Sequence, residues 1–247
     1  MACQSVVPRA LSMVGSALSA DDLSPKMRAY LAEVYRLADM QPKSDYVSTS
    51  SLADLLAVSA PAVNRMVNRL KDLGLIEHEP YQGIRLTDKG HAEALKQLRN
   101  HRITEAFLVD FMQWDWGDVY EEASRISGTV SDVFVQRMAE LAGQPRYSPH
   151  GEPIPTADGQ IEHLDDVLLS DIDDEQDVIV TRMRTRETDR LNYIKALGLV
   201  PGAHFQVLHK APFNGPMQLK LDDEYRIIGH NLAELIRVKP ADADSGA

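Results

Sequence analysis

The stretch that decides the fold is SAPAVNRMVNRLKDLGLI, which runs from Ser59 to Ile76. Its first residue suits the N-cap of a helix, Pro61 lies in the first turn where a missing N–H costs nothing, and Gly74 is the kind of residue that ends a helix. Apolar side chains recur at helical spacing between these signals and predict one buried face: Val63, Met66, Val67, Leu70 and Leu73. The opposite face is polar and basic, with Asn64, Arg65, Asn68, Arg69 and Lys71. Amides and guanidinium groups bond base edges and phosphates, so this pattern predicts a DNA recognition helix.

The sequence on either side of this helix predicts a winged helix-turn-helix. Upstream, residues 26–38 and 47–56 have the apolar spacing of two further helices, and the second opens on hydroxyl side chains. Downstream, residues 75–79 and 84–86 alternate apolar and polar side chains and are joined by Tyr81-Gln82-Gly83, which is typical of a hairpin. Three helices followed by a two-stranded wing would place the third helix in the major groove and the wing beside the DNA backbone.

We therefore expect this part of the chain to contact DNA through three elements. The side chains expected at base edges are Ala62, Asn64 and Arg65. Those expected near phosphates are Ser48, Ser50, Arg69, Lys71 and Arg85, and Ser59, Pro61 and Gln82 complete the predicted interface. The alternative is a winged helix used only for protein contacts, because helix-turn-helix folds host other functions.

The charge of the chain is divided unevenly along its length. The 247 residues include 26 Lys and Arg against 37 Asp and Glu, which gives a net charge of −11, and 44% of them are hydrophobic. Residues 1–100 carry 12 basic and 11 acidic side chains, whereas residues 101–175 carry 4 and 17. The acidic residues therefore lie away from the predicted recognition helix. Because they weaken non-specific binding to phosphates, base contacts and dimerisation are expected to supply the affinity for DNA. The composition is that of an ordinary soluble globular protein, long enough for two or three domains.

The apolar pattern changes twice after the wing. Helices are expected over 87–112, 116–127 and 131–141, and they carry more apolar surface than they can bury alone. We interpret them as a dimer interface, since a helix-turn-helix protein has to span two half-sites about 34 Å apart. From residue 176 the period becomes two, which predicts a small β barrel. The predicted fold is α+β, with a flexible arm over 1–24, the winged helix-turn-helix over 25–90, a helical dimerisation domain over 91–155, an acidic linker over 156–175, the barrel over 176–240 and a tail over 241–247.

The cysteine content and the first residues bear on location. Cys3 is the only cysteine, so no disulfide can form within the chain, and a reducing cytoplasm is expected. No apolar run approaches the length of a membrane span, and no membrane partner is expected. Residues 9–20 faintly resemble a secretory leader, but their apolar part is short and interrupted by serine, so we interpret them as part of the arm.

Several stretches, taken in order, resemble one family. They are YLAEVYRLAD (Tyr30 to Asp39), the recognition helix, YQGIRLTDKG (Tyr81 to Gly90), LRNHRITEAFL (Leu98 to Leu108), SPHGEPIP (Ser148 to Pro155) and LGLVPGA (Leu197 to Ala203). Over roughly residues 25–240 the chain is similar to the diphtheria toxin repressor family of iron- and manganese-dependent transcriptional repressors. The resemblance implies a homodimer that binds Mn²⁺ or Fe²⁺ and then occupies palindromic operators, typically of metal-uptake genes. It also implies that the barrel is an SH3-like domain related to ferrous-iron-transport accessory proteins.

The resemblance indicates where metal ligands would stand, and most of them are absent. His101 and Glu105 match two ligands of the family, and their i, i+4 spacing places an imidazole and a carboxylate on one helix face, which suits a divalent ion. The other ligand positions of the family hold Ala29, Tyr120, Ser124, Ser127 and Gly128. Hydroxyls are weak ligands for these ions, and alanine and glycine have no side chain to donate. The primary site of the family is therefore expected to be lost.

Two hypotheses about the signal follow. In the first, the protein binds DNA without metal and responds to something else. In the second, a metal binds at a remodelled site on His101 and Glu105, completed by one of the carboxylates Glu121, Glu122, Glu187 or Asp189. The alternative for His101 and Glu105 is a hydrogen-bonded pair on a helix surface. Six other histidines show no ligand spacing and are expected at the surface: His91, His150, His163, His204, His209 and His230.

Nothing in the sequence indicates an enzyme. There is no glycine-rich phosphate loop, nucleophile elbow or His-Glu-x-x-His motif, and the acidic run over 171–175 lacks the glycine and spacing of a calcium loop. We expect a homodimeric transcriptional regulator that represses its genes and takes part in manganese or iron homeostasis. An interaction adaptor, in which the barrel binds a protein and the winged helix only dimerises, is the remaining alternative.

Overall fold

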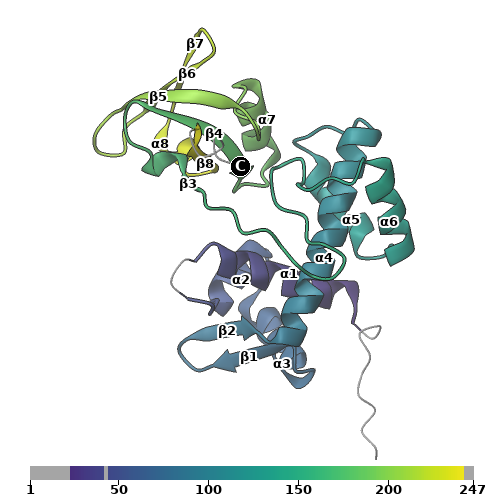
Figure 1. The fold of residues 1–247 in the computed structure, drawn as a ribbon. Coiled ribbons are helices and arrows are strands. Elements are labelled where there is room, and N and C mark those ends of the chain that lie inside the picture. Colours follow the sequence, from purple (N-terminus) through teal and green to yellow (C-terminus); the bar gives the residue numbers. More distant parts are fainter. Residues whose placement is uncertain (1–22, 42–43, 242–247) are drawn as a thin grey trace, which may run out of the picture.

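The computed structural model describes residues 23–41 and 44–241, and these form three parts (Figure 1). A winged-helix part comes first, a group of helices follows, and a strand-rich part ends the chain. This arrangement confirms the predicted α+β architecture. Cys3, the arm over residues 1–22 and the tail beyond residue 241 lie outside the described residues. Within the described part, no helix is long and apolar enough to cross a membrane.

The winged-helix part consists of three helices and a two-stranded wing. Its elements are α1 (Pro25–Asp39), α2 (Thr49–Leu55), α3 (Ala60–Asp72), β1 (Ile76–Glu79) and β2 (Gly83–Leu86). The Ser24 hydroxyl accepts the N–H of Met27 at the start of α1, and the Ser48 hydroxyl accepts the N–H of Ser51 at the start of α2. Ser59 occupies the N-cap of α3, but its side chain makes no capping hydrogen bond within the described residues. The start of α3 was therefore predicted correctly, whereas its capping bond was not.

Two positions at the edges of this part differ from the sequence-based expectation. Leu23 is buried in the same core as Val63, Val67 and Leu70 of α3, so the chain is packed before residue 24. Val47 was expected to begin the second helix, but it pairs with Ile84 of the wing. Gly83 accommodates this pairing, because its φ is +119° and a Cβ there would lie 2.3 Å from the Val47 carbonyl oxygen.

The helical part begins with α4 (Asp88–Ala106), which runs from the wing into the middle of the molecule (Figure 1). The Thr87 hydroxyl accepts the N–H of Gly90 and caps this helix. A π-helical turn, η2 (Phe107–Phe111), extends α4, and α5 (Val119–Ser127) and α6 (Asp132–Leu141) pack against it. Several large apolar side chains of this part remain exposed: Phe111, Met112, Trp114, Val133, Phe134 and Leu141.

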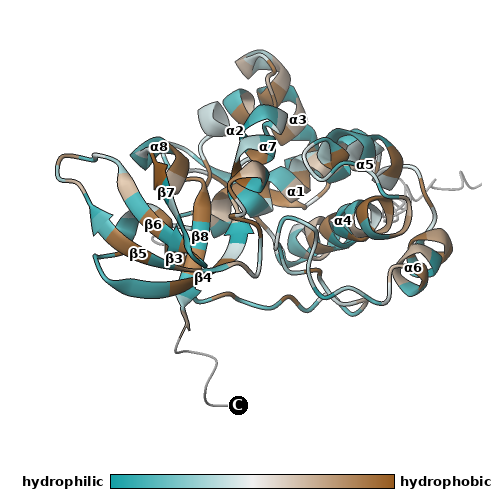
Figure 2. Ribbon diagram, turned by 90° about the horizontal axis from the view of Figure 1, so that it is seen from above, coloured by the Kyte–Doolittle hydropathy of each residue, from teal (hydrophilic) through white to brown (hydrophobic). Residues whose placement is uncertain are grey.

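The strand-rich part is one antiparallel sheet with two short helices. Its elements are β3 (Val167–Leu168), η3 (Leu169–Asp171), β4 (Gln176–Met183), α7 (Thr188–Ala196), β5 (His204–Lys210), β6 (Met217–Leu221), β7 (Glu224–Ile228), α8 (His230–Ala233) and β8 (Ile236–Pro240). The strand order is β3-β8-β4-β5-β6-β7. Apolar and polar residues alternate along β5, β6 and β8 (Figure 2), and Val178, Val207, Leu219 and Val238 are among the side chains that form the core.

The predicted acidic linker over 156–175 is wrong in its second half. Leu169 and Ile172 are buried in the core of the strand-rich part, and β3 pairs with β8. Asp166 is also buried, because its carboxylate accepts hydrogen bonds from Thr181 and from the guanidinium groups of Arg182 and Arg237. An acidic stretch is normally predicted to be exposed to solvent, but here side chains of β4 and β8 bind the carboxylate of Asp166.

Candidate functional site

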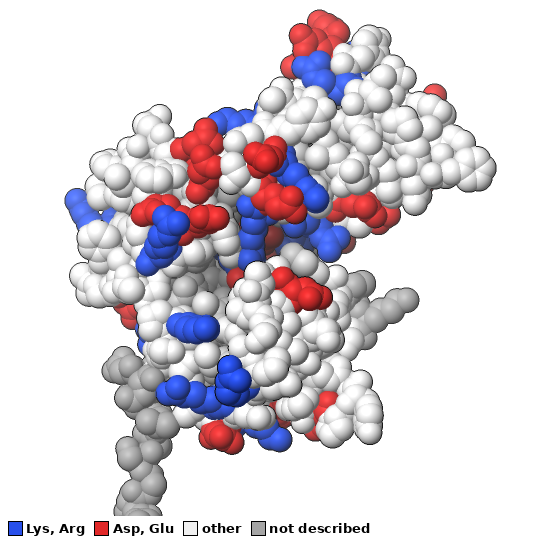
Figure 3. Space-filling model, turned by 180° about the vertical axis from the view of Figure 1, so that it is seen from behind, with Lys and Arg blue, Asp and Glu red and all other residues white. Residues whose placement is uncertain are grey.

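The outer face of α3 is the first candidate site, and it is open to solvent. Val63, Val67 and Leu70 turn into the core. The side chains predicted to meet DNA on this helix are exposed, except for Ala62, which is half-buried: Ser59, Pro61, Asn64, Arg65, Arg69 and Lys71. Figure 3 shows basic side chains gathered over the winged-helix part, at the end of the molecule away from the sheet. The helix therefore presents amides and cations outward, where they can reach base edges and phosphates.

The other predicted DNA contacts surround this face. Ser48 and Ser50 are exposed at the start of α2, and Gln82 is exposed at the tip of the wing. Arg85 is also exposed, but its Nη2 lies 2.6 Å from Oε2 of Glu77 on the neighbouring strand. A phosphate would have to compete with Glu77 for this guanidinium, whereas no carboxylate is paired with Arg65 or Arg69 within the described residues.

The second candidate site is the pair His101 and Glu105 on α4, and it is buried. The two residues are 5% and 3% exposed, and Nδ1 of His101 lies 3.5 Å from Oε2 of Glu105. The interpretation as a surface pair is therefore wrong. His150, which was expected at the surface, is only 7% exposed, and its Nδ1 lies 3.7 Å from Oε1 of Glu105. His150 lies in the segment SPHGEPIP, which brings this second imidazole to the Glu105 carboxylate. The spacing of His150 and Glu105 in the sequence does not indicate this contact.

Hydrogen bonds fix how the two imidazoles face this carboxylate. The Ser124 hydroxyl donates to the carbonyl oxygen of Tyr120, so it accepts from Nε2 of His101 at 3.0 Å. Nε2 of His150 donates to the carbonyl oxygen of Trp116 at 2.9 Å. Both Nδ1 atoms therefore point at Glu105. Burial alone would raise the pKa of Glu105, but attraction to His101 and His150 outweighs it and holds this pKa far below its usual range.

The remaining positions that match ligands of the family hold no ligand set. Ala29 offers no donor atom, and a Cβ on Gly128 would lie 3.1 Å from the Cβ of Pro25. The Ser127 hydroxyl lies 3.4 Å from Nε2 of Gln97, and the Ser124 hydroxyl is engaged by His101. Across the described ranges 23–41 and 44–241, no group of three or more His, Cys, Asp or Glu side chains is arranged to hold a metal ion.

The carboxylates proposed to complete a remodelled site lie elsewhere. Glu121 and Glu122 bind Arg125 on the outer side of α5, and Glu187 binds Arg190 at 2.8 Å. Glu187 and Asp189 are exposed at the start of α7. Glu121 and Glu122 lie on the outer side because α5 turns Val119 and Ala123, not its acidic side, toward Leu108. The structure does not bring them to His101 and Glu105.

A group of polar and charged residues that the sequence did not predict to meet lies beside these positions. Glu33 of α1 is 6% exposed, and its carboxylate accepts from Nη1 and Nη2 of Arg186 at 3.2 and 3.0 Å and from Nη1 of Arg36 at 2.8 Å. The Tyr120 hydroxyl donates to the same carboxylate at 3.3 Å and accepts from Arg36 at 3.0 Å. We call Glu33, Arg36, Tyr120 and Arg186 the arginine clamp. The i, i+3 spacing of Glu33 and Arg36 was visible in the sequence, but the arrival of Arg186 was not.

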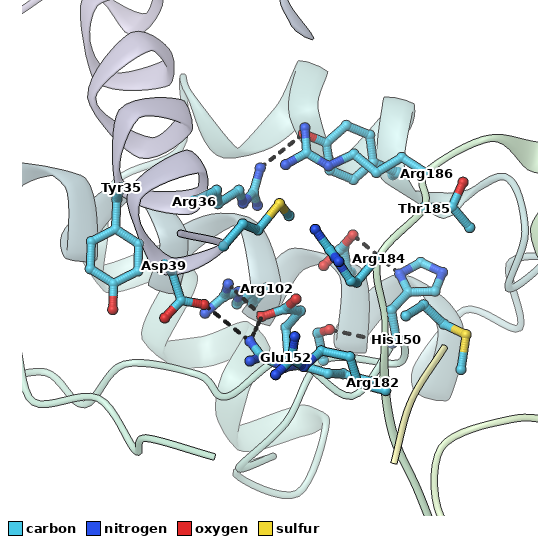
Figure 4. A pocket seen from close by; sticks show the side chains of 16 residues that line it. Tyr35, Arg36, Asp39, Arg102, His150, Glu152, Arg182, Arg184, Thr185 and Arg186 are labelled. Carbon is cyan, nitrogen blue, oxygen red and sulfur yellow. Dashed lines mark hydrogen bonds and ion pairs between the residues drawn. The ribbon is translucent and has the colours of Figure 1, made fainter. Parts of the chain in front are cut away.

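The arginine clamp borders a small pocket where the three parts meet (Figure 4). The pocket has a volume of about 60 Å³, and arginines reach into it from α1, α4, β4 and the segment after β4. Arg182 binds Asp39 of α1 at 3.2 Å, Glu152 at 3.4 Å and Asp166 at 3.0 Å. Burial would raise the pKa of Glu33, but Arg36 and Arg186 lower it to about 2, so the carboxylate is ionised at neutral pH.

Comparisons with known proteins bear on all three parts. Residues 22–84 match the model of the iron dependent repressor N-terminal DNA binding domain, and residues 87–156 match the iron dependent repressor metal binding and dimerisation domain. Residues 167–240 match the FeoA domain. The order and extent of the three matches follow the three parts of the fold. The chain belongs to the iron-dependent repressor family.

Individual relatives and structures of the family agree with this assignment. The chain is 26% identical over 231 residues to the iron-dependent repressor IdeR of Mycobacterium leprae, which covers 89% of this chain and 99% of that protein. It is 34% identical over 116 residues to an uncharacterised HTH-type transcriptional regulator of Methanocaldococcus jannaschii, covering 47% of this chain and 91% of that protein. A manganese-dependent transcriptional repressor solved in complex with manganese has a TM-score of 0.80 at 29% identity, covering 87% of this chain and 99% of that chain. This member of the iron-dependent repressor family is therefore a DNA-binding transcriptional regulator of the metal-dependent repressor type.

Proposed function

We propose that this protein binds a palindromic operator as a homodimer and represses the genes beside it. The observation that supports this most directly is the outer face of α3. Asn64 and Arg65 are exposed near its N-terminal end, and Arg69 and Lys71 follow along it. In a winged helix-turn-helix this end enters the major groove, so Asn64 and Arg65 would read base edges while Arg69 and Lys71 bind phosphates.

The exposed apolar side chains of the helical part support the homodimer. Phe111, Trp114 and Phe134 are each about half exposed, and they lie in the part that matches the dimerisation domain of the family. Large exposed apolar side chains within one part of a protein are candidates for a protein interface. A second copy of the chain on this surface would place two recognition helices on two half-sites of one operator.

The relatives are named for iron or manganese, and the candidate ligands of this chain fit such an ion poorly. The primary positions offer two hydroxyls, an alanine and a glycine, and only His101 and Glu105 match family ligands. The donors that remain are the imidazole of His101 and the carboxylate of Glu105, and His150 also contacts this carboxylate. These residues therefore do not form a ligand set that fits Mn²⁺ or Fe²⁺. The regulated genes are proposed to belong to manganese or iron homeostasis, and the protein to act in the cytoplasm.

Fluorescence anisotropy with a fragment of its own promoter tests the proposal. Wild-type protein should bind this fragment more tightly than a scrambled fragment of equal length, and analytical ultracentrifugation should find two protomers on each operator. Asn64→Ala and Arg65→Ala should weaken specific binding while leaving the circular dichroism spectrum unchanged. Arg190→Ala is the matched control, because it removes an exposed arginine of α7 far from the recognition helix.

The same variants distinguish the alternative of an interaction adaptor. An adaptor would use the strand-rich part to bind a protein and would be indifferent to Asn64 and Arg65. If wild-type protein does not distinguish its promoter fragment from the scrambled one at any salt concentration, the repressor proposal fails.

A further inference from the structure

The arginine clamp lies against the positions that match metal ligands of the family. Tyr120 stands at one of these positions, and its ring centroid is 4.7 Å from that of His101. The guanidinium carbon of Arg186 is 4.3 Å from the Tyr120 ring centroid, and that of Arg36 is 5.7 Å away. Two permanent cations of the protein are therefore packed next to the region in which the family would bind an ion.

These cations disfavour further positive charge nearby. The guanidinium groups of Arg36 and Arg186 lie against the ring of Tyr120, which packs on the buried imidazole of His101. A divalent ion at this imidazole would be repelled by both guanidinium groups, and the repulsion scales with the charge of the ion. The carboxylate of Glu33, which is bonded to both arginines and to Tyr120, offsets one of the two positive charges, so the arginine clamp keeps a net charge of +1.

The clamp also connects the three parts of the molecule. Glu33 belongs to α1 of the winged-helix part, Tyr120 to α5 of the helical part, and Arg186 to the segment between β4 and α7 of the strand-rich part. Arg182 of β4 adds a second connection to α1 through Asp39. The Arg186–Glu33 contact is bidentate, which fixes the orientation of both groups as well as their distance.

We propose that the arginine clamp takes the place of the divalent ion in this protein. The guanidinium of Arg186, supplied by the strand-rich part, is the cation that holds α1 and therefore the recognition helix in the arrangement that binds DNA. Operator binding then needs no metal. The inference rests on the proposed function and deepens it by naming what sets the active arrangement.

Operator binding in the presence and absence of metal is the first test. Wild-type protein in EDTA should bind the promoter fragment as tightly as in Mn²⁺ or Fe²⁺, and titration of Mn²⁺ should leave the free-ion electron paramagnetic resonance signal undiminished. Arg186→Gln and Glu33→Gln should weaken operator binding in EDTA by roughly 5- to 150-fold, the range usual for coupling between two sites. Arg190→Gln is the matched control and should change nothing, because Arg190 is exposed and pairs only with Glu187 in the described chain. Arg186→Lys, which keeps the charge but loses the bidentate contact, should fall between wild type and Arg186→Gln.

Hydrogen–deuterium exchange tests the clamp without DNA. In wild-type protein, amide exchange in α1 and in residues 184–190 should be slow in EDTA and unchanged by Mn²⁺. Arg186→Gln should accelerate exchange in both segments and leave the strands β5 and β6 protected, which also shows that the variant is folded.

The outcomes separate this inference from the proposed function. Stoichiometric Mn²⁺ binding that tightens operator binding overturns the inference and leaves the repressor proposal standing. Operator binding by Arg186→Gln and Glu33→Gln at the wild-type level in EDTA also overturns it. If no DNA binding is found at all, the repressor proposal fails, and exchange in α1 that is equal in wild type and Arg186→Gln rejects the clamp independently.

Discussion

The arginines of α3 and those of the arginine clamp are the same chemical group in two opposite settings. Arg65 and Arg69 are exposed on the recognition helix. Arg36 and Arg186 bind a carboxylate that is almost fully buried. A guanidinium such as that of Arg65, which has no carboxylate partner among the described residues, is available to a phosphate or a base, whereas one that is paired inside the protein holds two of its elements together. The partner and the burial of an arginine therefore decide its role.

Arg85 is intermediate between these two settings, because it is exposed and also paired with a carboxylate. It is exposed on the wing, yet it binds Glu77 and lies 5.3 Å from the ring centroid of Tyr46. An exposed pair of this kind contributes little to stability and can be exchanged for a phosphate. The wing is therefore expected to add affinity for DNA without adding sequence preference.

The largest effect is expected where the clamp is broken at its centre. Glu33→Ala leaves the guanidinium groups of Arg36 and Arg186 without their shared carboxylate in a buried place. Removing one partner of a buried ion pair costs about 3–5 kcal/mol of unfolding free energy. Urea unfolding followed by circular dichroism measures this loss. Glu121→Ala, which breaks an exposed pair with Arg125, is the control and should change stability by less than about 0.5 kcal/mol.

The pH dependence of stability should reveal the same carboxylate. The pKa of Glu33 is about 2 in the folded protein and near 4.5 in the unfolded chain, so protons favour the unfolded state between these values. The stabilisation is fully present above about pH 4.5 and is lost as the pH falls toward 2, with a total of about 3 kcal/mol. Urea unfolding at pH 6, 4.5 and 3 should give a flatter profile for Glu33→Gln than for wild type. Parallel profiles would contradict the prediction.

A smaller effect, on DNA binding rather than on stability, is expected on α3. Arg65→Ala should cost about 1–3 kcal/mol of binding free energy and relax the base preference at one position of each half-site. Anisotropy with single-base variants of the operator measures this preference. The unfolding free energy should stay within about 0.5 kcal/mol of wild type, because Arg65 lies outside the core.

The smallest effect is expected at a phosphate contact. Lys71→Ala should weaken binding to the operator and to scrambled DNA alike, and it should reduce the slope of log K against log salt by about 0.9. A series of anisotropy titrations between low and physiological salt measures this slope. A change confined to one DNA sequence would assign Lys71 to a base contact instead.

The sequence predicted most of the winged-helix part, because its signals are local. Ser48, Pro61 and Gly74 mark helix ends, and the apolar residues of α3 recur at the helical period. It also predicted a strand-rich part from residue 176 onward, but β3 lies before this residue, within an acidic stretch. The burial of Asp166 could not be predicted, since it depends on Arg182 and Arg237, which arrive from strands far along the chain.

The order of the three parts and the exposed polar face of α3 follow from residue identity and period alone. The absence of ligand side chains at Ala29, Ser127 and Gly128 follows from residue identity together with the family resemblance, which marks these positions. Only the tertiary structure decided that His150 joins His101 on Glu105 and that Arg186 meets Glu33 across 153 residues of chain. Such contacts are set by the packing of whole parts against one another. No local pattern records which buried charge a distant arginine will neutralise.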